Sequence, residues 1–314
     1  MRIRVLLLIS ILLVFFLFPQ VLPPYVVTLM TLSLIYAIAA MSLNILQGYL
    51  GLPALGHMTF FAFGAYATGI LTSRYHFGFW INLPLSIVAA AIAAAILTPL
   101  ILRAVKLYFM MITLSIALCV WGLAIRWVDM TGGDNGISGI PRPDLGLPWS
   151  MGATLPFYYL ILIFFLINLG LIFLLIRSPF GTTLVGIRDS ESRMSEMGYH
   201  VKIHKYLAFI VTAMFAGGAG CMFTYYSRFI SPDVINLEHC MKLVLMVALG
   251  GPGTVLGPVL GAFIIIFAEQ TISILTARWL MIIAVLYYLT ANLPEGVLGL
   301  LAKARSQLWG KARG

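Results

Sequence analysis

Residues 157–176 read FYYLILIFFLINLGLIFLLI, a stretch that contains no charged side chain. An α-helix needs about 20 apolar residues to cross the hydrocarbon core of a bilayer. A second continuous run extends from Val5 to Phe18. Because the strands of a membrane β-barrel alternate apolar and polar residues over short segments, these runs exclude a barrel and predict an all-α integral membrane protein.

The composition extends this prediction to the whole chain. Of its 314 residues, 61% are hydrophobic and 9% are charged, and the mean hydropathy is +1.03. Soluble domains carry about 25% charged residues, because their surface faces water. We therefore expect residues 1–314 to form one membrane domain, a polytopic helical bundle of about eight to ten transmembrane helices.

Apolar runs separated by polar loops place the individual helices. The N-terminal run has the basic flank and apolar centre of a signal peptide but lacks an A-x-A cleavage site, so we interpret it as an uncleaved first helix. The two runs that flank Gly257 are short and glycine-rich, which leaves two helices, one broken helix or a re-entrant hairpin as alternatives. The predicted spans are residues 5–22, 25–47, 55–72, 81–102, 107–128, 157–176, 207–226, 241–256, 258–275 and 279–293.

The formal net charge is +9, and the distribution of the basic residues decides what this charge means. They gather in loops and at the termini, which is the positive-inside pattern of a membrane protein and not a nucleic-acid surface. The spans above place all four basic clusters, and both termini, on the cytoplasmic side. The clusters are Arg2 and Arg4; Arg103 and Lys106; Arg177, Arg188, Arg193, Lys202 and Lys205; and Lys303, Arg305, Lys311 and Arg313 of a tail at 294–314.

Two loops are longer than a turn requires. The extracytoplasmic loop, 129–156, is rich in Gly and Pro and is expected to form a structured cap or short amphipathic elements. In the cytoplasmic loop, 177–206, residues Thr183–Met197 fit a short helix with one apolar face that ends near Gly198. Such a helix on the inner face lies on lipid or docks on a partner. The apolar residues of that face are Leu184, Ile187, Met194 and Met197.

Two Gly/Pro interruptions lie at membrane depth. Non-helical backbone there is tolerated where it is buried in protein or lines a water-filled cavity, and paired interruptions point to the binding region of a transporter. The first interruption has an equal alternative interpretation as an ordinary cytoplasmic loop that joins two helices. For His57 we expect a hydrogen-bonded histidine at the membrane interface in preference to a ligand-binding role. The candidate pathway residues are Asn44, Gln47, Gly48, Gly51 and His57 in the first interruption and Gly251, Gly253 and Gly257 in the second.

Glu269 is the acid that lies clearly inside an apolar span. A carboxylate in the membrane is a functional candidate by default. We expect it to line the pathway, to pair with Arg278, or to be protonated.

Chemistry-bearing motifs are missing from the sequence. There is no GxxxxGK[ST] phosphate loop, no GxSxG or HExxH, and no CxxC pair or Cys/His cluster. Cys119, Cys221 and Cys240 are interpreted as packing residues. Small residues such as Ala213, Gly217 and Cys221, and the run 89–95, favour close helix packing. We expect no enzyme activity, metal or bound cofactor.

Four stretches together carry a resemblance to a known family. They are LNILQGYLGLPALGHMTFFAFGAYATGIL, LYFMMITLSIALCVWGLAIRWVDMTGGDNGISGIP, RSPFGTTLVGIRDSESRMSEMGYHVKIHKYLAFIVTAMFAGGAG and LGGPGTVLGPVLGA, with NLPEGVLGLL near the end of the chain. The sequence resembles the permeases of ABC importers for branched-chain amino acids, and the LivM branch in particular.

This resemblance implies a multi-pass permease of the bacterial inner membrane that works with a second, homologous permease, two cytoplasmic ABC ATPases that bind the ATP, and a periplasmic binding protein. It also implies that residues 181–198 form the segment that docks on the ATPases. Importers of urea and short amides look similar, so the substrate class stays open between them and amino acids. The coupling residues implied are Gly181, Ile187, Arg188, Asp189, Glu191 and Gly198.

Two other classes compete with an ABC permease. An ion-coupled secondary transporter would place ionisable groups at membrane depth, where Glu269 is the clear candidate. A membrane scaffold without a pathway would not need glycines and amides at that depth.

Overall fold

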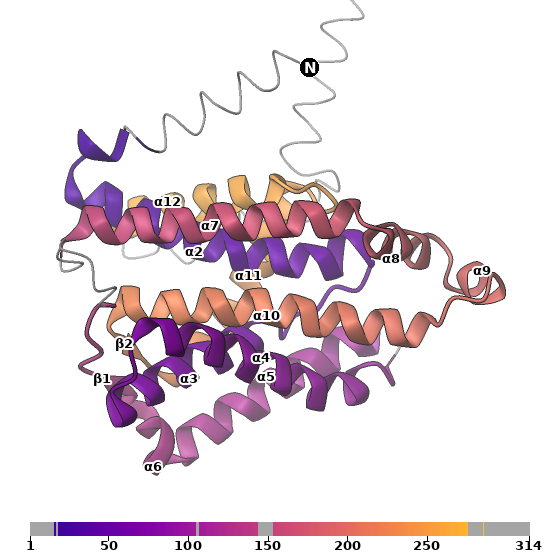
Figure 1. Cartoon of the computed structure of the whole chain (residues 1–314), viewed down its shortest axis with the longest axis horizontal. Helices are drawn as coiled ribbons and strands as arrows, with labels where there is room; N and C mark the ends of the chain where they lie inside the picture. Colours follow the sequence, from indigo (N-terminus) through magenta and orange to yellow (C-terminus); the bar gives the residue numbers. More distant parts are fainter. Residues whose placement is uncertain (1–15, 17, 105–106, 144–152, 276–284, 286–314) are drawn as a thin grey trace, which may run out of the picture.

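The computed structural model describes residues 16, 18–104, 107–143, 153–275 and 285. Over these residues the chain is a bundle of long helices with one two-stranded β-ladder, which confirms the all-α fold class (Figure 1). The predicted spans 5–22 and 279–293, the tail 294–314 and Arg278 lie outside the described residues. The α-helices are α2 (Pro24–Asn44), α3 (Met58–Tyr75), α4 (Phe79–Ile101), α5 (Leu107–Arg126), α6 (Val128–Thr131), α7 (Thr154–Arg177), α8 (Pro179–Asp189), α9 (Glu191–Glu196), α10 (Val201–Ser227), α11 (Leu237–Gly250) and α12 (Gly257–Leu275). The remaining elements are η1 (Phe18–Gln20), η2 (Ile45–Tyr49, a π-helical turn), η3 (Gly133–Asn135), η4 (Pro232–Ile235), β1 (Ile137–Ser138) and β2 (Phe229–Ile230).

Within the part of the chain that the structure describes, six helical spans are long and apolar enough to cross a membrane, which fits a multi-pass membrane protein. They are Pro24–Tyr49, Phe79–Ile101, Tyr108–Arg126, Thr154–Arg177, Val201–Ser227 and Gly257–Ile274. The predicted spans 55–72 and 241–256 coincide with α3 and α11, which are not among these six.

The long helices run between two ends of the bundle (Figure 1). At one end lie α8 and α9; at the other, β1 pairs antiparallel with β2, with Ile137 opposite Ile230. We call these the α9 end and the β end. Helix α7 leads into α8, and α10 leads from α9 back to β2, so these two helices span the whole distance.

Helix α2 is the centre of the bundle. It is apolar on all sides, as is typical of a fully buried helix, and its residues from Leu34 to Ala40 are at most 2% exposed. It contacts α7, α10, α11 and α12. Its position decides which residues can meet at the site, because the interruptions follow its last turn.

Small residues let α3, α4 and α10 approach closely, as predicted. A Cβ added at Gly64 would collide with the backbone of Gly217, and one added at Gly217 would collide with the Cβ of Ala90. A Cβ at Gly220 would meet the backbone of Phe61. Cys221, the residue after Gly220 on α10, is fully buried. Cys119 is exposed on α5.

The run around Gly257 forms two helices joined by a short turn. Helix α11 begins earlier than predicted, because the side chain of Asn236 caps it by accepting a hydrogen bond from the backbone N–H of His239 (2.9 Å). It ends at Gly250 and not at residue 256, because Gly251 adopts a φ of +101°, which glycine tolerates best. Helix α12 then packs directly on α11, since a Cβ at Gly261 would overlap the carbonyl of Met246. With 14 residues, α11 is about 21 Å long at 1.5 Å per residue.

The prediction of one continuous helix over residues 183–197 is wrong. The segment forms two helices, α8 and α9, because Ser190 is extended (φ −162°, ψ 103°) and its side chain caps α9 at the N–H of Arg193. Helix α10 follows at once and begins at Val201, six residues earlier than the predicted 207. Gly198 does close α9, with a φ of +88°.

Part of the predicted extracytoplasmic loop 129–156 lies within the described residues, and there it is structured. Helix α6, the turn η3 and strand β1 follow one another, and β1 ties the loop to β2. The ladder fixes the loop against the β end of α3, because a Cβ at Gly69 would meet the side chain of Ile230.

Candidate functional site

The two Gly/Pro interruptions meet in the structure. The side chain of Asn44, the last residue of α2, donates to the carbonyl of Thr254 (2.7 Å) and accepts from the backbone N–H of Gly253 (3.0 Å). One amide therefore satisfies a donor and an acceptor of the turn between α11 and α12. We call this contact, with Gly48, Gly51 and Arg188 beside it, the Asn44 junction.

Glycine is required on one side of this junction. The π-helical turn η2 widens the end of α2 and brings Gly48 against Gly253, so that a Cβ on Gly48 would overlap the backbone nitrogen of Gly253. Single π-turns within helices are frequent at functional sites. The close approach explains the glycine at position 48, and the φ of +82° explains the glycine at position 253.

Arg188 of α8 reaches into the junction. Its guanidinium donates to the carbonyl of Gly48 (2.7 Å), and its stem lies where a Cβ on Gly51 would stand, 2.7 Å from Cγ. Gly51 has a φ of +75°, a conformation that side chains rarely adopt. A second contact, to Asp189 (3.1 Å), keeps the guanidinium charge paired at the surface. The segment predicted to meet the ATPases is thereby joined to the first interruption, and through Gly48 and Asn44 to the second.

The other predicted pathway residues lie beside the junction. Gln47 follows Asn44 on η2, and its buried Oε1 has no hydrogen-bond partner among the described residues. His57 is 1% exposed and lies 2.9 Å, Nε2 to Oγ, from Ser42 of α2. One ring nitrogen is hydrogen-bonded as expected, but the buried Nδ1 has no hydrogen-bond partner among the described residues, and the ring lies in the core and not at an interface. Gly251 and Gly257 bound the turn that Asn44 holds.

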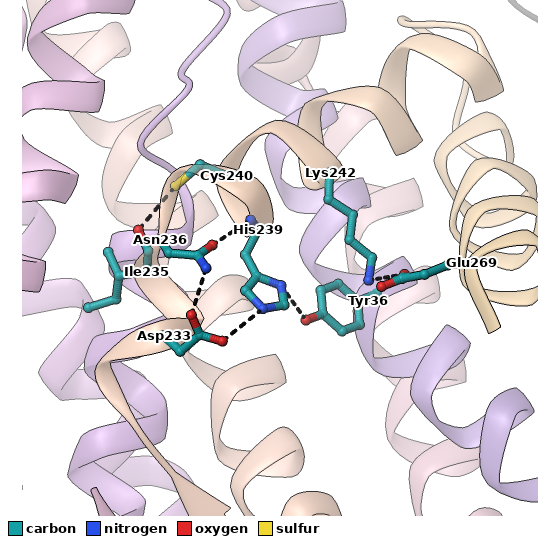
Figure 2. A network of polar contacts seen from close by, with 8 residues as sticks. All are labelled: Tyr36, Asp233, Ile235, Asn236, His239, Cys240, Lys242 and Glu269. Carbon is teal, nitrogen blue, oxygen red and sulfur yellow. Dashed lines mark hydrogen bonds and ion pairs between the residues drawn. The ribbon is translucent and has the colours of Figure 1, made fainter. Parts of the chain in front are cut away.

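A second polar cluster, the Lys242 network, lies deeper between α2, α11 and α12 (Figure 2). Lys242 of α11 forms an ion pair with Glu269 of α12, and its ammonium also lies 5.3 Å from the ring centre of Tyr36 on α2. The Tyr36 hydroxyl is 3.4 Å from Nδ1 of His239. His239 Nε2 is in turn 3.7 Å from a carboxylate oxygen of Asp233.

This network runs from the surface into the bundle. The exposed fraction of the side chain falls from 68% at Asp233 to 24% at His239 and to 10% at Lys242, with 15% at Glu269. Asn236 holds the outer end by donating to Asp233 (2.6 Å). The network therefore connects the water-exposed β end with an ion pair inside an apolar bundle.

Sequence reasoning found Glu269 but not its partner. Lys242 lies at the edge of the predicted span 241–256, whereas the earlier start of α11 puts it in the second turn of the helix. The signal in the sequence that predicts this pair is a basic residue, Lys242, inside one apolar run and an acid, Glu269, inside the next. Tyr36 and His239 carry no comparable signal, because their contact depends on how α2 and α11 pack.

The predicted coupling residues divide into buried and exposed groups. Ile187 is 3% exposed and faces the bundle, together with Leu184 at 1%. Gly181 lies in the first turn of α8, which Ser178 caps. Glu191 is exposed and pairs with Lys205 of α10 (2.6 Å), which fastens α9 to the bundle. The exposed surface that remains is formed by Asp189, α9, Met197 and Gly198.

An apolar cavity of about 270 Å³ lies apart from both clusters, between α3, α4, α5 and α6. Tyr66, Val120 and Trp127 are among its lining residues. Among the residues that the structure describes, no group of three or more His, Cys, Asp or Glu side chains is arranged to hold a metal ion.

Comparison with known proteins agrees with the resemblance seen in the sequence. A family profile described as "Branched-chain amino acid transport system / permease component" matches residues 25–291. The chain is 30% identical over 300 residues to the high-affinity branched-chain amino acid transport system permease protein LivM of Escherichia coli (strain K12), an alignment that covers 87% of this chain and 69% of that protein. It is 28% identical over 316 residues to the LivM protein of Salmonella typhimurium (strain LT2), with 92% and 73% covered. No solved structure matches the chain.

Proposed function

The chain belongs to the family of branched-chain amino acid transport permeases, and from this premise we propose that it is the membrane-spanning permease subunit of an ATP-driven importer. Its cargo in this proposal is a branched-chain or related small amino acid, the substrate named for both LivM relatives. The chain itself is a transport protein without a catalytic role, and ATP is bound by partner subunits.

The observation that supports this proposal best is the contact of Arg188 with the Asn44 junction. A surface segment, α8 and α9, projects from the α9 end (Figure 1), and one of its side chains bonds the carbonyl of Gly48. A push or pull on α8 would therefore act on the end of α2 and on the turn between α11 and α12. This is the mechanical link that a permease driven by an external ATPase requires.

The proposal includes an orientation. The α9 end would face the cytoplasm of a bacterial inner membrane, because loops next to membrane spans retain Lys and Arg on that side and Arg177, Arg193 and Lys202 lie there. Both termini would then be cytoplasmic. The β end, with exposed Asp134, Asp233 and Glu238, would face outward.

This orientation gives each partner subunit of the proposed importer a place to bind. Two ABC ATPases would dock on the exposed surface of α9 and its neighbours, and a substrate-binding protein would deliver cargo at the β end. A second, homologous permease would complete the pathway, and lipid would cover the exposed apolar faces of α4, α5 and α7.

Reconstitution of the complete transporter in proteoliposomes tests the proposal. ATP inside should drive uptake of L-leucine in the presence of the binding protein. Uptake that persists without the ATPases, or that follows an ion gradient alone, would instead support a secondary transporter. Uptake of urea or short amides with no uptake of leucine would replace the proposed cargo.

The Arg188→Ala variant tests the mechanical link. A hydrogen bond from a charged donor is worth about 1.5–3 kcal/mol, so we expect leucine transported per ATP hydrolysed to fall about tenfold or more. The matched control is Arg126→Ala, which removes an exposed arginine of α5 at the β end and should leave this ratio unchanged. An unchanged ratio in Arg188→Ala would show that coupling does not pass through the Asn44 junction.

A further inference from the structure

We propose that the ion pair between Lys242 and Glu269 is a transient binding site for the two charges of a zwitterionic amino acid. Lys242 would receive the carboxylate and Glu269 the ammonium group as the cargo passes between α11 and α12. The inference rests on the proposed function and deepens it by naming the residues that would bind the two charges of the amino acid.

The pair has unused bonding capacity. A lysine ammonium carries three N–H donors, and a carboxylate offers about four acceptor positions. Within the described residues, the ammonium of Lys242 meets Glu269 and the Tyr36 ring, and no further hydrogen bond reaches either charged group. A buried ion pair compensates for lost hydration only when its remaining donors and acceptors are also satisfied. The pair is therefore better suited to accept a polar ligand than to act as a rigid clamp.

The surroundings give a ligand a polar route to this pair. Asp233, His239 and Tyr36 lead from the β end to Lys242 in a continuous series of contacts (Figure 2). Each carries a polar group in a bundle whose other surfaces are mostly apolar. The series begins at an exposed carboxylate, where the delivered cargo would enter.

The chemistry of the pair selects a zwitterion. Separating two opposite charges in an apolar interior is unfavourable unless each charge finds a new partner. An α-amino acid supplies both partners at once, because its ammonium and carboxylate groups are bonded to the same carbon atom. Urea or a neutral amide supplies neither charge, and a simple amine or carboxylic acid supplies one, so none of these compensates for opening the pair.

The geometry also indicates how the site could be opened. Helices α11 and α12 approach closely at the turn, where a Cβ on Gly250 would overlap the carbonyl of Gly257. That turn is bonded to Asn44, and Asn44 lies next to the Gly48 carbonyl that Arg188 contacts. Movement at the Asn44 junction would therefore change the distance between Lys242 and Glu269.

The test uses the complete transporter in proteoliposomes and compares wild type with the neutral double variant Lys242→Met/Glu269→Gln. Replacing both members of a buried pair by neutral groups often leaves stability unchanged. We expect the double variant to assemble, and leucine transported per ATP hydrolysed to fall about tenfold or more, the scale on which loss of a charge partner weakens binding. Transport by the double variant at the wild-type ratio would overturn the proposal.

A second variant covers the case in which the neutral pair does not assemble. Lys242→Arg/Glu269→Asp retains both charges but alters their reach, so the fold keeps its ion pair while the fit to the ligand changes. A lower transport ratio with normal assembly supports the proposal, and an unchanged ratio assigns the pair a structural role and overturns it. If the wild-type transporter fails to move leucine with ATP, the proposed function is wrong. If the wild type transports leucine and the variant matches it, only the inference about the ion pair is wrong.

Discussion

At the scale of single residues, the side chain of Asn44 shows how a polar group in a membrane helix acquires its role. In sequence it is an amide at membrane depth, which is compatible with lining a pathway. In the structure both of its polar atoms are bonded to the backbone of the turn between α11 and α12. Its first effect is therefore to hold that turn.

Replacing Asn44 with Leu should destabilise the transporter. The substitution removes the partner of the N–H of Gly253 and of the carbonyl of Thr254 in two part-buried hydrogen bonds, and each such bond contributes about 0.5–1.5 kcal/mol. We expect a clearly lower thermal denaturation midpoint of the purified complex. Asn168→Leu is the control, because Asn168 bonds to Phe164 within its own helix and should shift the midpoint much less; equal shifts would contradict the role given to Asn44.

At the scale of elements, close approach of backbones decides how the end of α2 meets the α11–α12 turn. The turn η2 and Gly253 touch through Gly48, where no side chain fits. The bonds of Asn44 and Arg188 form only at this separation. The two Gly/Pro interruptions of the sequence are thus in close backbone contact in the structure.

Gly48→Ala should separate these elements. The added methyl group overlaps the backbone of Gly253, and overpacking of this kind costs about 1–3 kcal/mol. We expect leucine uptake to be lost or strongly reduced in the reconstituted transporter. Gly170→Ala is the matched control, since a Cβ at Gly170 of α7 meets no atom within 4 Å. Wild-type uptake by Gly48→Ala would refute the close contact.

At the scale of the whole molecule, the bundle has two chemically different ends. The β end carries the ladder and exposed acids, and the α9 end carries α8, α9 and most of the basic loop 177–206. The Asn44 junction lies toward the second end, and the Lys242 network runs inward from the first. This arrangement suits an importer that receives cargo at one end and force at the other.

Cysteine labelling in intact bacteria tests this arrangement. In a Cys119→Ala background, Asp134→Cys should react with a membrane-impermeant maleimide from outside, because Asp134 is exposed at the β end. Ser195→Cys on the exposed helix α9 should react only after the membrane is permeabilised. The reverse pattern would invert the proposed orientation.

Several features of the coupling segment could be read in part from the sequence. Gly198 correctly marks its C-terminal end, because glycine readily adopts the left-handed conformation found there. Helix α8 begins at Pro179, four residues before the predicted Thr183, because proline is favoured in a first helical turn. Its division into α8 and α9 was not predictable from the apolar pattern, since Leu184, Ile187 and Met194 fit one continuous helix. The break depends on Ser190, whose hydroxyl competes with the helix by capping the next one.

The sequence by itself determined that the chain is a helical membrane protein and where most of its helices lie, because apolar length and charge position are local properties that the bilayer reads directly. The tertiary structure alone decided that Asn44 meets Gly253, 209 residues further along, and that Lys242 pairs with Glu269. These contacts depend on the position of α2 between α11, α12 and α10. That position results from the packing of whole helices, and no local pattern of residues encodes it.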